Sequence, residues 1–220
     1  MTKLTGPDAP PAAGGAPRQL IVLLHGVGAD GADLISLSQL MGRFLPHAHF
    51  VAPNGPEACD MAPMGYQWFS LQDRRPDAML AGIKKTAPLV DAFIDEELTK
   101  HGLEDKDLAL VGFSQGTMMS LHVAPRRPQS MAGVLGFSGA LLGAETLMSE
   151  VVSKPPVLLI HGDADPIVPV QAMNGAIAGL EAVDIPVEGR IRPGLAHGID
   201  PEGMNAGAAF LGDLFKDGDG

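Results

Sequence analysis

Cysteine, tryptophan and tyrosine are scarce in this chain of 220 residues, which contains one of each. The single cysteine, Cys59, excludes a disulfide within the chain and a zinc site built from cysteines. It also fits a reducing compartment, so we expect a cytoplasmic protein. No hydrophobic run approaches the roughly 18 residues that cross a bilayer. The first residues also lack the apolar core of a secretion signal, so we expect no stable membrane insertion.

Basic residues are also few. Fifteen lysines and arginines stand against twenty-six acidic residues, which gives a net charge of −11. The basic residues never cluster beyond a pair, so the chain lacks the positive footprint of a nucleic-acid-binding protein. The same deficit disfavours an anionic membrane surface. We therefore expect a small-molecule partner and no nucleic acid.

The length and the hydrophobic fraction of 45% suit one globular domain with a sizeable core. Residues 1–17 contain four prolines among glycine and alanine, a composition that predicts a loose N-terminal arm. We expect a single domain over residues 18–215 and a frayed tail over residues 216–220.

Short apolar runs alternate with helical patterns along this domain. Strands are expected at 19–24, 49–52, 108–111, 132–137, 156–161 and 187–191, and helices at 34–44, 78–101, 115–124, 170–182 and 201–215. Within the second helix, Pro88 predicts a kink or a break. Unbroken apolar strands that alternate with helices indicate an α/β fold, in which a mostly parallel central sheet carries helices on both faces.

Ligands of such sheets bind beyond the carboxyl ends of the strands. The polar and glycine-rich loops fall at those ends: 25–31, 112–116, 161–169 and 193–198. One of them carries Ser114 in the pattern Gly-x-Ser-x-Gly, between an apolar run and a helical pattern. A serine on such a sharp strand-to-helix turn is exposed as a nucleophile, with the first amides of the helix beside it.

A serine hydroxyl needs a base, and the base needs an orienting group. The chain order Ser, Asp, His is the order expected when the serine sits on this kind of turn. Ser114 is followed by Asp163 or Asp165 and then by His197, each just past a predicted strand. On the residues alone we prefer Asp165, because Pro166 stiffens the loop at that point, and Asp163, which could instead cap the turn, stays the alternative.

Acyl transfer also requires amide donors for the developing oxyanion. We expect one from the residue after the nucleophile, Gln115, and one from the early glycine-rich loop, at Val27. That loop matches the dinucleotide-binding spacing Gly-x-Gly-x-x-Gly, but no acidic residue ends the next strand near Phe50. A dinucleotide site is therefore excluded.

Four motifs occur in order at 24–30 (LHGVGAD), 112–116 (GFSQG), 161–169 (HGDADPIVP) and 194–198 (GLAHG). Together they resemble the phospholipase/carboxylesterase family of α/β hydrolases, which includes bacterial carboxylesterases and acyl-protein thioesterases. The resemblance implies the α/β-hydrolase fold, with Ser114 as nucleophile, Asp165 as orienting acid and His197 as base. It also implies an oxyanion hole at Val27 and Gln115, and a bracing role for Asp30.

The resemblance implies a serine carboxylesterase that hydrolyses short- to medium-chain esters without a metal or cofactor. Acyl-protein thioesterase or lysophospholipase activity is the alternative within the family, and a catalytically silent ligand-binding fold is a further one. The family often forms dimers, so a homodimer is expected. Apolar side chains of the 57–75 loop and of the Asp165 loop are candidates either for an acyl pocket or for core packing: Met64, Trp68, Phe69, Leu71, Ile167 and Val168.

Overall fold

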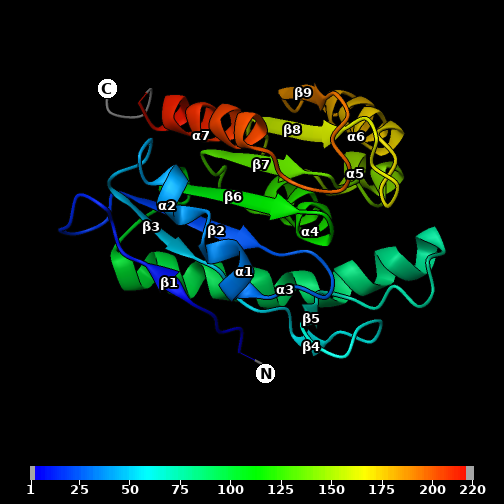
Figure 1. Cartoon of the computed structure of the whole chain (residues 1–220), viewed down its shortest axis with the longest axis horizontal. Helices are drawn as coiled ribbons and strands as arrows, with labels where there is room; N and C mark the ends of the chain where they lie inside the picture. The colour runs from blue at the N-terminus through cyan, green and yellow to red at the C-terminus, as the bar shows by residue number, and fades with distance from the viewer. Residues whose placement is uncertain (1–2, 217–220) are drawn as a thin grey trace.

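A seven-stranded sheet runs through the computed structural model, which describes residues 3–216 (Figure 1). Its strands lie in the order β1-β3-β2-β6-β7-β8-β9, and all neighbours are parallel except β1 and β3. The strands are β1 (Asp8–Ala9), β2 (Gln19–Leu24), β3 (Ala48–Val51), β6 (Leu108–Phe113), β7 (Gly133–Phe137), β8 (Val157–Gly162) and β9 (Val187–Arg192). This arrangement confirms the predicted mostly parallel sheet.

Helices cover both faces of the sheet (Figure 1). On one face lie α1 (Gly31–Ile35), α2 (Ser38–Met41) and α7 (Pro201–Lys216). On the other lie α3 (Pro76–His101), α4 (Gln115–Val123), α5 (Ala144–Glu150) and α6 (Gln171–Glu181). Two short 3₁₀ helices, at Asp105–Asp107 and Ala124–Arg126, and a small hairpin of β4 (Glu57–Ala58) and β5 (Tyr66–Gln67) complete the fold.

Side chains alternate across the strands and so build two separate cores. In β2, Leu20, Val22 and Leu24 pack toward α3 and α4, whereas Ile21 and Leu23 pack toward α1 and α7. All five are fully buried. A strand buried on both faces must be apolar throughout, which is why β2 reads as a continuous hydrophobic run.

The N-terminal segment is packed, which corrects the expectation of a loose arm. Residues Asp8–Ala9 pair with β3, and the Ala52 amide donates to the Pro7 carbonyl at 2.9 Å. Leu4 is buried in the core. Hydrogen bonds to β3 fix the position of this segment, which its composition alone would leave loose. Apart from Lys216, which ends α7, the tail expected at 216–220 lies outside the described residues.

Two helix predictions also change. The single helix expected over 34–44 is divided into α1 and α2, because the hydroxyls of Ser36 and Ser38 donate to the carbonyls of Asp33 and Ile35 and compete with helical hydrogen bonds. Conversely, α3 continues through Pro88 as one helix, so the break expected there is absent. Within residues 3–216, no helix combines the length and the apolar character needed to span a membrane.

Candidate active site

The turn between β6 and α4 holds Ser114 in a strained conformation. Its torsions are φ 53° and ψ −114°, a region that residues with side chains rarely adopt. The Ser114 amide donates to the Phe137 carbonyl at 2.9 Å, which ties the turn to β7. A Cβ on Gly116 would collide with the carbonyl oxygen of Leu24, so only glycine permits this close approach of α4 to β2. This geometry is that of a strand-turn-helix nucleophile.

His197 and Asp165 come from the loops after β9 and β8 and form a direct pair. His197 Nδ1 lies 2.7 Å from Asp165 Oδ2. The other carboxylate oxygen, Oδ1, accepts the amides of Ile167 at 2.8 Å and Val168 at 2.9 Å. The Asp165 side chain is fully buried, and 18% of the His197 side chain is exposed. The carboxylate is therefore held rigidly, while the imidazole reaches the surface.

These hydrogen bonds also determine the charge of Asp165. Burial alone would raise its pKa, but the bonds from His197 and from the amides of Val168 and Ile167 outweigh burial and hold the pKa below its ordinary value. Asp165 is thus ionised at neutral pH. An ionised partner at Nδ1 keeps a proton on that nitrogen and leaves Nε2 of His197 as the basic atom.

The two aspartates that the sequence left open have different contacts. Asp163 Oδ1 accepts the amide of Gly194 at 2.7 Å, three residues before His197. Asp163 therefore fastens the loop, whereas Asp165 contacts the imidazole itself. Buried His161 supports Asp165, because its Nε2 lies 2.7 Å from the Val168 carbonyl oxygen and 3.4 Å from Asp165 Oδ2.

Phe113 connects the serine turn to the histidine loop. Its ring lies against the His197 imidazole, with centroids 4.9 Å apart and planes tilted by 48°. Because Phe113 directly precedes Ser114, this contact holds His197 beside the nucleophile turn. The structure thus brings all three expected triad residues to one edge of the sheet, with the Asp165–His197 bond formed.

The early glycine-rich loop packs directly on the same turn. A Cβ on Gly26 would lie 3.3 Å from the Ser114 Cβ, so a side chain there would press on the nucleophile. The neighbouring Gly28 amide donates to the Tyr66 carbonyl at 2.9 Å. Within the described residues, the amide of Val27 has no backbone acceptor. Gln115 occupies the first position of α4, where amides have no partner within the helix.

Buried His25 fixes the position of this loop. Its Nε2 accepts the Gly55 amide at 2.9 Å, so its proton is on Nδ1, which donates to the Gly26 carbonyl at 2.7 Å. Burial lowers the pKa of His25, in keeping with a neutral ring. At the far end of the loop, Asp30 and Asp33 form a reciprocal capping box at the start of α1. Asp30 therefore does brace the loop.

The side chain of Gln115 has a role that sequence reasoning missed. Its Oε1 accepts the Trp68 amide at 2.9 Å, and its Nε2 donates to the Phe69 carbonyl at 2.7 Å. The residue is fully buried. Gln115 therefore fastens the 57–75 loop to the first turn of α4, and the only signal for this in the sequence is a polar residue where the helix begins.

Trp68 and Phe69 are core residues, so of the two roles expected for them, acyl pocket or core packing, the structure favours core packing. Trp68 is 0% exposed and Phe69 3% exposed. The Trp68 indole Nε1 donates to the His25 carbonyl at 2.8 Å, so the ring supports the glycine-rich loop from inside. A buried indole N–H requires a hydrogen-bond acceptor, and here the His25 carbonyl is that acceptor.

The other pocket candidates lie closer to the surface. Met64 is 78% exposed and Ile167 63% exposed. Leu71 and Val168 are partly buried and pack against the core. That these four side chains contact the substrate stays a prediction. Trp68 and Phe69, by contrast, are buried under the loops that surround the site.

A family model described as Phospholipase/Carboxylesterase matches residues 12–214. The chain belongs to the phospholipase/carboxylesterase family. This membership confirms the resemblance drawn from the four motifs, and with it the α/β-hydrolase fold and a hydrolase activity of this family.

Relatives of this family member include both esterases and thioesterases. Acyl-protein thioesterase 1 from Kluyveromyces lactis is 33% identical over 213 residues, covering 90% of this chain and 93% of that protein. The crystal structure of esterase PE8 has a TM-score of 0.92 at 42% identity, covering 96% of this chain and 99% of that one. Acyl-protein thioesterase 2 from Zea mays has a TM-score of 0.75 at 26% identity, covering 95% and 99%.

Proposed function

We propose that this protein is a serine carboxylesterase that hydrolyses short- to medium-chain carboxylic esters through an acyl-enzyme on Ser114. The observation that carries the proposal is the buried, ionised Asp165 bonded to His197 beside the strained Ser114 turn. Membership of the phospholipase/carboxylesterase family supports the proposal. A cytoplasmic location and a homodimer stay predictions.

In the proposed reaction, His197 Nε2 takes the proton of Ser114 as the hydroxyl attacks the ester carbonyl. Asp165 keeps the imidazole in the tautomer that this step needs and stabilises the imidazolium that forms. The amides of Gln115 and Val27 stabilise the oxyanion, and each such donor is worth roughly 3–4 kcal/mol in the transition state. His197 returns the proton to the leaving alcohol, and water activated through the same residue then releases the acid.

The preference for shorter acyl chains is supported by the burial of the aromatic residues. Trp68 and Phe69 are buried in the core, so an acyl chain can contact little of their surface. Two other apolar candidates, Met64 and Ile167, are exposed to solvent. Exposed side chains favour an open contact surface over an enclosed tunnel for a long acyl chain.

A chain-length series tests the proposal. Purified protein is assayed with p-nitrophenyl acetate, butyrate, octanoate and palmitate. We expect kcat/KM to be highest for acetate or butyrate and to fall at palmitate, and Ser114→Ala to abolish turnover of all four while the circular dichroism spectrum is unchanged. A profile that rises to palmitate would contradict the chain-length proposal, and full activity of Ser114→Ala would contradict the mechanism.

Thioesterase activity is the second candidate, favoured by the Kluyveromyces lactis relative. The two activities are separated by pairing each oxygen ester with the thioester of the same acyl group. A higher kcat/KM for the thioester at equal chain length supports the thioesterase, and the reverse supports the esterase. Lysophospholipase activity is tested in parallel by release of fatty acid from a lysophosphatidylcholine.

A further inference from the structure

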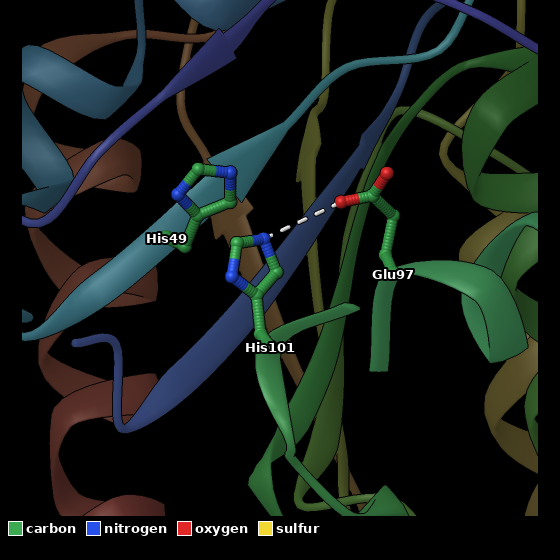
Figure 2. Close-up of side chains that lie close together, drawn as sticks. All are labelled: His49, Glu97 and His101. Atoms are coloured by element: carbon green, nitrogen blue, oxygen red, sulfur yellow. Dashed lines mark ion pairs between the residues drawn. The ribbon is translucent and has the colours of Figure 1, made fainter. Parts of the chain in front are cut away.

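Figure 2 shows three side chains with metal-ligand chemistry that lie close together: His49, Glu97 and His101. His49 comes from β3, and Glu97 and His101 come from the last turns of α3. The spacing of four residues puts Glu97 and His101 on one face of the helix. One ligand atom from each side chain lies within 4.8 Å of the ligand atoms of the other two.

One ring nitrogen of each imidazole is buried without a hydrogen-bond partner. Nε2 of His49 and Nε2 of His101 are both inaccessible and form no hydrogen bond. His49 Nε2 lies 3.2 Å from Asp8 Oδ2, and His101 Nε2 lies 3.5 Å from Glu97 Oε2, but neither contact has hydrogen-bond geometry. Two orphaned ring nitrogens, each facing a carboxylate, are unfavourable unless something between them is bound.

The rings are also close to each other. Their centroids are 4.2 Å apart and their planes are tilted by 44°. Imidazole binds a metal ion in its neutral form, through a ring nitrogen, so two rings this close can offer their nitrogens to one ion.

We propose that His49, Glu97 and His101 bind a Zn²⁺ ion, with Asp8 or a water molecule as fourth ligand. Two imidazoles and a carboxylate form a ligand set that suits Zn²⁺. Ligand atoms of tetrahedral zinc stand roughly 3.3 Å apart at bond lengths of about 2.0–2.1 Å, so the side chains close in slightly on binding. Lys100, whose Nζ is 3.0 Å from Glu97 Oε2, gives up that exposed contact.

The geometry of the fold makes this a structural site, independent of the proposed reaction. His49 is in register with Leu20 of β2, which pairs with Leu108 at the start of β6. Ser114 follows the far end of β6, roughly 20 Å along the strand. A groove of about 720 Å³, lined in part by Asp8, Glu97 and Lys100, lies beside the cluster. Bound zinc would cross-link the end of α3 to β3.

The test uses tag-free, full-length protein treated with a chelator and dialysed. Zn²⁺ is added during isothermal titration calorimetry and thermal unfolding, and Co²⁺ is used as a spectroscopic probe. We expect one Zn²⁺ per chain and, at a hundredfold excess over its Kd, a rise in Tm of roughly 5–10 °C. Co²⁺ should give the intense visible absorption of a tetrahedral site.

Variants locate the binding. His101→Gln and Glu97→Gln should weaken Zn²⁺ binding at least about tenfold and remove the rise in Tm. His47→Gln, two residues from His49 but outside the cluster, and His197→Asn, at the candidate active site, should bind Zn²⁺ as the parent does. The compared quantity is the difference in Tm with and without Zn²⁺, so a loss of basal stability in any one variant does not obscure the result.

The proposal is overturned if the parent shows no one-to-one binding, or if His101→Gln and Glu97→Gln bind Zn²⁺ as tightly as the parent. Loss of binding in His197→Asn alone would assign the ion to the active site and overturn the proposal equally. Because the test reads binding and unfolding, failure of the proposed esterase activity leaves its outcome unaffected.

Discussion

Replacing Gln115 with alanine separates the side chain of this residue from its backbone. The variant keeps the amide that we assign to the oxyanion hole, because that amide belongs to the main chain. It deletes the two bonds that fasten the 57–75 loop, to the Trp68 amide at 2.9 Å and to the Phe69 carbonyl at 2.7 Å. Any change therefore reports on the loop rather than on the oxyanion donor.

The size of the effect follows from burial. Gln115 and Trp68 are fully buried, so the lost bonds leave a donor and an acceptor without partners. Each unsatisfied buried group costs roughly 1–3 kcal/mol, so Gln115→Ala should lower the free energy of unfolding by about 2–6 kcal/mol. For a chain of this size that corresponds to a fall in Tm of roughly 4–24 °C. KM for an ester substrate should rise more than kcat falls, because the loop is displaced while the nucleophile turn is kept.

Thermal unfolding and steady-state kinetics with p-nitrophenyl butyrate measure both effects. Gln72→Ala, an exposed glutamine of the same loop, is the matched control and should leave Tm and KM close to those of the parent. A Gln115→Ala variant with the Tm and KM of the parent would refute the assigned role of the side chain. A fall in kcat with unchanged KM would refute the separation between loop and oxyanion hole.

Asp165→Asn should lower kcat by a factor on the order of 10⁴, the size reported for the equivalent change in the serine protease triad. Asp163→Asn should lower it far less, since Asp163 contacts only the Gly194 amide; equal losses would contradict the assignment. Arg127→Ala should lower the free energy of unfolding by about 3 kcal/mol, because its buried guanidinium pairs with Asp91, Asp95 and Asp105. The exposed pair of Arg190 with Glu188 is the control, and Arg190→Ala should cost at most about 1 kcal/mol. Burial lowers the pKa of His122 to about 4 from 6.5. The unfolded chain therefore binds more protons between these values, and stability falls as the pH drops from 6.5 toward 4, by up to about 3 kcal/mol. His122→Leu should flatten this dependence in urea unfolding at pH 7 and pH 5, and an unchanged slope would contradict it.

The parts of the fold that follow from local pattern were predictable. Both-face burial makes β2 a continuous apolar run, and strand-helix alternation then places the ends of β6, β8 and β9 at one edge. The Gly-x-Ser-x-Gly pattern indicates Ser114, and chain order together with loop position indicates His197. Residue spacing could not separate Asp163 from Asp165, because both are in one short loop and only its folding shows which carboxylate meets the imidazole.

Features that depend on tertiary contacts were not predictable. The indole of Trp68 is in the core because its N–H reaches the His25 carbonyl, a residue 43 positions away. The packing of Leu4 and the pairing of β1 with β3 likewise depend on residues distant in the sequence. The composition of residues 1–17 therefore predicts a loose arm, whereas the described part of this segment is packed. α5 was not predicted, since its seven residues offer too few turns for a periodic pattern. His49 and His101 are 52 positions apart, and nothing in the sequence joins them.

The catalytic assignment depends on Ser114 being the activated nucleophile. Treating the protein with a fluorophosphonate probe and mapping the adduct by peptide mass spectrometry tests this most directly. We predict a single modified residue, Ser114, with labelling that falls sharply in Asp165→Asn and is absent in Ser114→Ala. Modification of a different residue, or no labelling under conditions where esters are hydrolysed, would contradict the mechanism.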